Sequence, residues 1–305
     1  HIVLLIKNGT VNTITKGIQK IGILIKDKKI VAMGEKLNSL STEFVLDGEV
    51  IGREDDYEEL NKELRANGEF DFDPNTDTLE IIDAQGQFIY PGFIDAHTHL
   101  GLWEDGMGVE GADGNEETDP ITPHLNVIDG INPMDRTFKE AYEGGITAVC
   151  TTPGSANVMG GQAAAIKTFG RRIDKMIIKN PVASKVAFGE NPKSCYGSND
   201  DTPQTRMAIA ALLRENLRKA EEYLFDLKSA EEDEDIDKPE FDIKLESLIP
   251  VLKKEIPLKA HAHRADDMFT AIRIAQEFDL KLTIDHCTEG HMIVEELLEE
   301  DYPLI

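Results

Sequence analysis

Short apolar segments separated by turn residues fill the first part of the chain. Alternating apolar and polar positions predict β-strands over residues 2–7, 21–26, 29–32 and 43–46. Asn8-Gly9 and Asp27-Lys28 are typical turn pairs between such strands. Residues 47–78 are rich in acidic and poor in large apolar side chains, which indicates a solvated insertion with one helical stretch near 57–65. Strand patterns return at 79–83 and 87–89, so we expect a small all-β domain over residues 1–90.

From Pro91 onwards, strand patterns alternate with helical ones. The strand patterns cover residues 93–97, 146–151, 163–168, 182–188, 257–263 and 281–286. Apolar residues at helical spacing, such as Leu213 and Leu217, predict helices over 206–224, 266–278 and 292–299. This alternation is typical of a parallel sheet or barrel, and about six βα units are present. A closed barrel needs eight. We therefore expect an α/β barrel domain over residues 91–305 that is truncated before strands seven and eight.

The charge balance narrows the choice of partners. The chain has 32 Lys and Arg against 58 Asp and Glu, a net charge of −26 that repels nucleic acid and anionic lipid. Its apolar runs are too short for a membrane span or a signal peptide. Three cysteines without a CxxC spacing fit a reducing compartment. We expect a cytoplasmic protein that acts on a small molecule, either as a monomer or as a homo-oligomer.

Two histidines, His97 and His99, lie two positions apart at the end of the first strand after Pro91. Residues two apart on a strand point to the same face, and neutral imidazole is a common ligand of zinc and related metals. In barrels of parallel strands, active sites lie at the C-terminal strand ends. The pair therefore predicts a metal site, although such a pair also arises by chance and can be a hydrogen-bonded part of a core.

Two later strands also end in histidine, which strengthens the prediction of a metal site. His261 and His263 end one strand and His286 ends the next. We select His261 as a metal ligand because it lies deeper in its strand. His263 is a candidate substrate contact or a group that supports a ligand, and His286 either holds a second metal or contacts the substrate.

Two residues near the end of strand 182–188 can complete or bridge the metal site. Glu190 can bind a metal directly through its carboxylate, whereas Lys185 can do so only after carbon dioxide converts its amine to a carbamate. The sequence does not choose between them, and both can instead be ordinary structural residues. The glycine-rich loops after the first two strands are expected to shape the substrate pocket, with Trp103 as a lining residue. Neither loop has the pattern of a phosphate-binding loop.

These residues resemble the amidohydrolase superfamily, in particular its imidazolonepropionase-like branch. The resemblance covers residues 1–46 and about 79–305. It rests on four motifs, namely Pro91-Gly92-Phe93-Ile94-Asp95-Ala96-His97-Thr98-His99, Gly189-Glu190-Asn191-Pro192-Lys193, Leu258-Lys259-Ala260-His261-Ala262-His263 and Ile284-Asp285-His286. It implies a distorted (β/α)8 TIM-like barrel and a small β-sandwich formed by both chain ends.

The resemblance also implies a reaction, which is hydrolysis of a C–N bond in an amide or cyclic amide by metal-activated water. One or two divalent ions would be needed, with zinc as the first choice and iron or manganese as alternatives. His97, His99 and His261 would be ligands, His286 and His263 would serve catalysis or the substrate, and the bridging carboxylate would fall on Glu190 or carbamylated Lys185. The family's aspartate at the end of strand eight has no counterpart here. Alternatives are a deaminase or dipeptidase on the same scaffold, or a metal-binding barrel fragment without catalysis.

Overall fold

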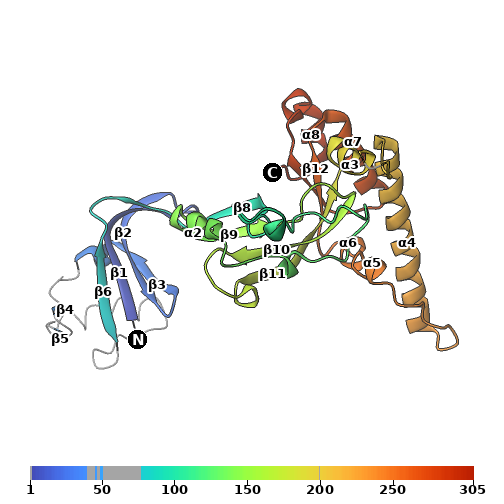
Figure 1. The fold of residues 1–305 in the computed structure, drawn as a ribbon. Helices are drawn as coiled ribbons and strands as arrows, with labels where there is room; N and C mark the ends of the chain where they lie inside the picture. Colours follow the sequence, from blue (N-terminus) through green and yellow to red (C-terminus); the bar gives the residue numbers. More distant parts are fainter. Residues whose placement is uncertain (1, 40–44, 47–48, 51–76, 199) are drawn as a thin grey trace. The chain divides into compact units, whose positions relative to one another are not determined.

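The computed structural model describes residues 2–39, 45–46, 49–50, 77–198 and 200–305. Its internal contacts divide the chain into two compact units, His1–Pro91 and Gly92–Ile305 (Figure 1). The described residues of the first unit form strands and one short 3-10 helix, whereas the second unit contains both strands and helices. None of the helices described is long and apolar enough to cross a membrane.

The first unit is built on a five-stranded sheet. Its strand order is β3-β2-β1-β6, and β7 also pairs with β1. The elements of this unit are β1 (Ile2–Asn12), β2 (Ile18–Lys26), β3 (Lys29–Gly34), a 3-10 helix (Glu35–Ser39), β4 (Val45–Leu46), β5 (Glu49–Val50), β6 (Thr78–Asp83) and β7 (Phe88–Ile89). One sheet face buries a cluster that includes Val3, Leu5 and Leu24. A second cluster includes Val11 and Ile23.

The two turn predictions in this unit have opposite outcomes. Asp27 and Lys28 connect β2 to β3 with positive φ angles of 50° and 66°, so that prediction is confirmed. The turn predicted at Asn8-Gly9 is wrong, because β1 continues through both residues. Asn8 has a φ of 58°, and the pairing with β2 shifts between Ile6 and Gly9, which is a β-bulge.

Several further predictions for the first unit lie outside the described residues. These are the start of the strand expected at 43–46, most of the acidic insertion and its helical stretch at 57–65. Pairing of β4 with β5 adds a separate two-stranded sheet. A β-sandwich formed with a second layer stays a prediction.

The second unit is a mixed α/β fold around a six-stranded sheet in the order β13-β12-β11-β10-β9-β8. Its strands are β8 (Phe93–Thr98), β9 (Ile146–Thr151), β10 (Met159–Lys167), β11 (Ile177–Ala187), β12 (Leu258–Ala262) and β13 (Leu282–His286). Its α-helices are α2 (Arg136–Glu143), α3 (Glu190–Gly197), α4 (Arg206–Glu232), α5 (Ile243–Glu246), α6 (Ile249–Leu252), α7 (Ala265–Glu277) and α8 (Val294–Glu300). All six predicted strands and all three predicted helices are therefore present; β9 has the predicted bounds, and the other elements have shifted ends. The closed eight-stranded barrel stays a prediction.

The expectation of six βα units was wrong at β10. This strand is antiparallel to both β9 and β11, while the other neighbouring pairs in the sheet are parallel. The connections at 152–158 and 168–176 contain no α-helix. A parallel crossover needs about a dozen residues or more. Both connections are shorter than that, so β10 can only return antiparallel.

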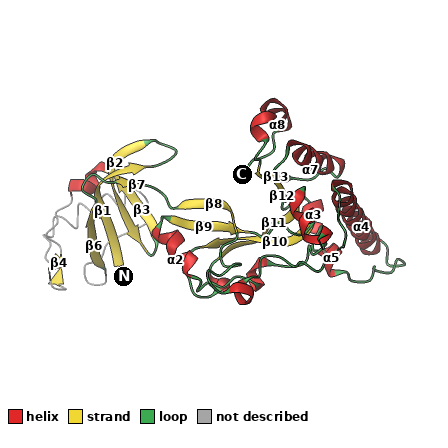
Figure 2. Ribbon diagram, turned by 45° about the horizontal axis from the view of Figure 1, so that its top comes forward, coloured by secondary structure: helices red, strands yellow, loops and turns green. Residues whose placement is uncertain are grey.

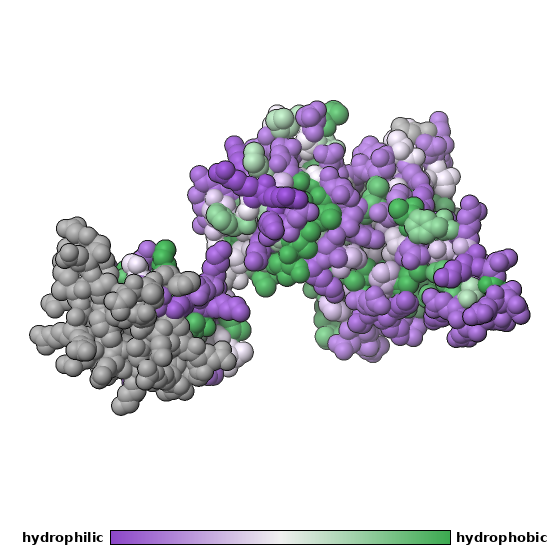
Figure 3. Space-filling model, turned by 90° about the horizontal axis from the view of Figure 1, so that it is seen from below, coloured by the Kyte–Doolittle hydropathy of each residue, from purple (hydrophilic) through white to green (hydrophobic). Residues whose placement is uncertain are grey.

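Helices α4 and α7 lie beside β11, β12 and β13 (Figures 1 and 2). Helix α4 begins at an N-cap, where Thr205 accepts a hydrogen bond from the Ala208 amide at 3.1 Å. The largest apolar core combines residues of the helices with outward-facing residues of the strands, among them Leu213, Ala260 and Ile284. The surface seen in Figure 3 is mostly hydrophilic, in keeping with the high content of charged side chains.

Candidate active site

Three neighbouring strands place charged and imidazole side chains on the sheet face opposite the helices. Lys185 of β11 pairs with Lys259 of β12. His261 of β12 pairs with Asp285 of β13. Side chains two positions apart on a strand share a face, so all four lie on one side of the sheet. Each is at most 3% exposed, which makes this face a buried polar layer.

Five histidines gather at the C-terminal ends of β8, β12 and β13. The ring of His286 lies 4.8 Å from that of His97, 4.7 Å from that of His261 and 5.1 Å from that of His263, measured between centroids. The His97 and His99 rings are 5.2 Å apart, and the His261 and His263 rings are 4.5 Å apart. The structure thus brings together all five histidines that the sequence singles out.

The Asp285 carboxylate lies beneath these rings and contacts three cationic or polar groups. Lys259 Nζ is 2.7 Å from Oδ1, Lys185 Nζ is 3.3 Å from Oδ2, and His97 Nδ1 is 2.9 Å from the same oxygen. Burial alone would raise the pKa of Asp285, but the contact with His97 and the charges of both lysines outweigh it and hold this pKa well below its usual range. Burial lowers the pKa of Lys185 to about 8 despite the nearby carboxylate.

Three of the clustered histidines, His261, His286 and His99, have lowered pKa values, which favour the neutral ring. Burial, followed by the charge of Lys185, lowers the pKa of His261 to about 3. Burial and the neighbouring His97 lower the pKa of His286 to about 4. Burial also lowers the pKa of His99. Neutral rings keep a free lone pair, which is the form that binds a metal ion.

Several imidazole nitrogens at this site are buried and have no hydrogen-bond partner in the described parts of the chain. Both ring nitrogens of His261 and Nε2 of His97 belong to this group. Buried polar atoms rarely stay unpaired, and a divalent metal ion would satisfy them, so the donor set fits such an ion in its chemistry. Among the described residues, no group of three or more His, Cys, Asp or Glu already has the spacing of a metal-ligand set. The closest ring pairs pack mostly edge to face instead.

His286 reaches the cluster through an unusual backbone conformation. It follows Asp285 directly, so strand alternation would point its side chain to the helix-covered face. His286 and Cys287 both have positive φ angles, 70° and 43°. Non-glycine residues adopt this left-handed conformation at a cost, and such residues cluster at functional sites. Here the turn directs the His286 ring towards His97 and His261.

Trp103 and His99 form the edge of the cluster nearest the glycine-rich loops. The two rings meet edge to face with centroids 5.1 Å apart. His99 Nδ1 is held 2.7 Å from the backbone carbonyl oxygen of Thr152. His263 Nδ1 is likewise 2.7 Å from the Thr288 hydroxyl. These contacts fix two of the rings from outside the cluster.

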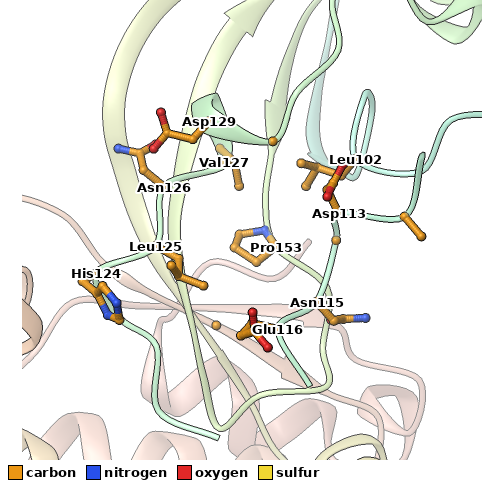
Figure 4. A pocket seen from close by; sticks show the side chains of 14 residues that line it. Leu102, Asp113, Asn115, Glu116, His124, Leu125, Asn126, Val127, Asp129 and Pro153 are labelled. Carbon is orange, nitrogen blue, oxygen red and sulfur yellow. The ribbon is translucent and has the colours of Figure 1, made fainter. Parts of the chain in front are cut away.

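A cavity of about 420 Å³ is lined mainly by the loop that follows β8, with Pro153 contributed by the loop after β9 (Figure 4). Asp113, Glu116, His124 and Asp129 contribute its polar lining, and Pro153 lies in its wall (Figure 4). The five clustered histidines and Trp103 do not line it. Its wall nevertheless adjoins the site, because Pro153 directly follows Thr152, the partner of His99.

The two candidates for a bridging carboxylate lie in different surroundings. Lys185 is fully buried and contacts Asp285 within the polar layer. Glu190 is exposed at the first position of α3, and its charge acts on Arg206. Among the residues that the structure describes, Glu190 makes no contact with the clustered histidines.

Sequence reasoning assigned no role to Asp285 or Lys259, although both belong to the polar layer. A sequence signal existed, because each is a charged residue inside a short and otherwise largely apolar strand, next to a selected histidine. Buried charges are rare unless they are paired. Only the tertiary structure shows that these two charges pair with each other, with Lys259 Nζ 2.7 Å from Asp285 Oδ1.

The fold and the site together define a mixed α/β protein with a buried histidine cluster at its strand ends. No protein-family model matches the chain. Among curated proteins, amidohydrolase tasK of Hapsidospora irregularis is 29% identical over 241 residues, 70% of this chain and 24% of that protein. An amidohydrolase from Thermotoga maritima MSB8 has a solved structure that matches with a TM-score of 0.81 and 39% identity, over 99% of this chain and 69% of that one. The chain belongs to the amidohydrolase family, and it spans about a quarter of the length of the curated relative named above.

Proposed function

We propose that this chain carries the metal-binding part of a hydrolase that cleaves a C–N bond in an amide or cyclic amide. Membership of the amidohydrolase family supports hydrolysis of an amide-type bond. Metal dependence is our own inference and rests on one observation: within the described residues, His261 and His97 hold buried ring nitrogens without a hydrogen-bond partner inside a cluster of five histidines. Zinc is the first choice for the ion, with iron or manganese as alternatives, and one or two ions are proposed.

The roles of the histidines follow from their positions. His97, His99 and His261 would hold the ion, because all three lie at strand ends. The pKa values of His99 and His261 are lowered, and buried ring nitrogens of His97 and His261 lack a hydrogen-bond partner among the described residues. A bound divalent ion would lower the pKa of a water molecule bound to it and would polarise the substrate carbonyl. His286 and His263 are more exposed than His261. They would contact the substrate and can exchange a proton with it.

Lys185 is a better candidate than Glu190 for a bridging carboxylate. A carbamate forms when a neutral amine attacks carbon dioxide and releases a proton. The lowered pKa of Lys185, about 8, leaves part of its amine neutral near pH 7, and the side chain lies in the polar layer. The imidazolonepropionase-like subtype remains part of this proposal and rests on the four sequence motifs that contain His97, Glu190, His261 and His286.

Metal analysis of the purified chain tests the proposal. After loading with zinc and removal of the excess, we expect about one or two equivalents to remain bound. Replacing His97 and His261 by Ala should remove most of this metal, together with any hydrolysis of a panel of amides and cyclic amides. The exposed His291 on the same unit provides the control, because His291→Ala should retain the metal. Less than about half an equivalent in the wild-type protein would contradict the proposal.

A further inference from the structure

Asp285 is the only carboxylate that contacts a ring of the histidine cluster within the described residues. It is 0% exposed, and its two carboxylate oxygens contact different groups. Oδ1 lies 2.7 Å from Lys259 Nζ. Oδ2 lies 2.9 Å from His97 Nδ1 and 3.3 Å from Lys185 Nζ. One carboxylate from β13 therefore connects side chains of β8, β11 and β12.

The contact with Asp285 bears on which ring nitrogen of His97 carries the proton. A neutral imidazole has one N–H and one lone pair, and the bond made by one nitrogen decides the role of the other. A carboxylate only accepts hydrogen bonds, so Asp285 favours the proton on Nδ1. The lone pair then lies on Nε2, which is buried and has no hydrogen-bond partner among the described residues.

We propose that Asp285 is a positioning residue that holds the proton of His97 on Nδ1 and so keeps Nε2 free to bind a metal ion. Lys259 acts with it by holding Oδ1, which leaves Oδ2 turned towards His97. This inference rests on the proposed function, in which His97 is a metal ligand. His97 Nδ1 and Asp285 Oδ2 are within hydrogen-bond distance at 2.9 Å, although the Nδ1 hydrogen is not aligned with the oxygen. Hydrogen bonds in active sites are often poorly aligned until the ligand is bound.

A purely structural ion pair between Asp285 and the lysines would have different consequences. It would contribute to folding, yet the position of the proton on His97 would not depend on it. The tautomer of His97 is therefore a readout that separates positioning from stability. Nitrogen-15 NMR of histidine side chains reports this tautomer directly in metal-free protein at pH 8, without any measurement of hydrolysis.

Asp285→Ala is the first test. We expect its His97 signal to change from the Nδ1–H form to a mixture of both tautomers. Its zinc affinity, measured by competition with a chromophoric chelator, should fall about 10–100-fold. Asp285→Asn restores an accepting oxygen and should recover the Nδ1–H tautomer and part of the zinc affinity. An unchanged tautomer in Asp285→Ala, or zinc affinity within about twofold of wild type, would overturn the proposal.

Lys259→Met provides a test that retains Asp285 if Asp285→Ala does not fold. We expect a loss of zinc affinity of about tenfold, because the carboxylate is no longer held from Oδ1. Unchanged affinity would overturn the role of Lys259. The exposed Asp279 pairs with Lys254 on the surface, so Asp279→Ala is the matched control and should bind zinc like wild type. Wild-type protein that binds no zinc would refute the proposed function, whereas zinc binding that is equal in all variants would refute positioning alone.

Discussion

Replacing Asp285 by Asn should destabilise the second unit far more than the same replacement at the surface. The side chains of Asp285 and Lys185 are both 0% exposed, and that of Lys259 is 3% exposed. Asn has almost the same size as Asp, so packing is preserved while the negative charge is lost. The variant must then bury two ammonium groups without a counter-charge. Breaking a buried ion pair in this way costs about 3–5 kcal/mol.

Asp279→Asn is the matched control for this loss. Its partner Lys254 is also a lysine, but the two side chains are 87% and 43% exposed. Ion pairs in such surroundings contribute about 1 kcal/mol or less, because water screens both charges. The difference between the two variants therefore isolates the effect of burial on the same chemical change.

Urea unfolding followed by tryptophan emission measures both variants. Trp103 is the only tryptophan and lies in the same unit as Asp285, so the signal reports unfolding of that unit. A free energy loss in Asp285→Asn no larger than that in Asp279→Asn would refute the reasoning. The pH provides a further check, because an unpaired Lys185 loses its proton more readily. Raising the pH from 7 to 9 should therefore recover more stability in Asp285→Asn than in wild type.

Two further predictions concern the histidines and the loops. Burial lowers the pKa of His261 to about 3, so the unfolded chain binds a proton there below pH 6.5 that the folded protein does not. This linkage should lower the unfolding free energy of metal-free protein by up to about 1.4 kcal/mol per pH unit as the pH falls from about 6.5 towards 4. Urea titrations of His261→Asn should show a weaker pH dependence, and an unchanged one would contradict the pKa shift. In Gly114→Ala, the new Cβ would lie 2.0 Å from Trp103 Cη2, so the ring must move from His99. The tryptophan emission spectrum should shift, and an identical spectrum would contradict the contact.

The sequence predicts the strands of the second unit well because their signal is local. Apolar runs bounded by turn residues, such as 93–97 and 281–286, depend on neighbours in the chain and appear as β8 and β13. The direction of β10 was mispredicted, since strand patterns contain no information on direction. The lengths of the connections do indicate the direction of β10, because the segments before and after this strand are too short for a parallel crossover.

For the site, the sequence identifies the histidines but not what holds them. Histidines at three strand ends indicate one site, because the ends of parallel strands meet at one edge of a sheet. The sequence does not decide whether Lys185 or Glu190 is the bridging carboxylate, because the two residues lie only five positions apart. The structure separates them by burial, with one in the polar layer and the other exposed at the start of α3.

The sequence by itself determined the types and order of the strands and helices, the high negative charge and the set of chemically capable residues. Only the tertiary structure decided which of these residues share an environment. Asp285 meets Lys185 across 100 positions of sequence and Lys259 across 26, through the register of three adjacent strands. His286 joins the cluster through a left-handed turn that strand periodicity does not predict. The physical reason is that periodicity reports contacts between near neighbours in the chain, whereas burial and pKa depend on strands that are distant in sequence.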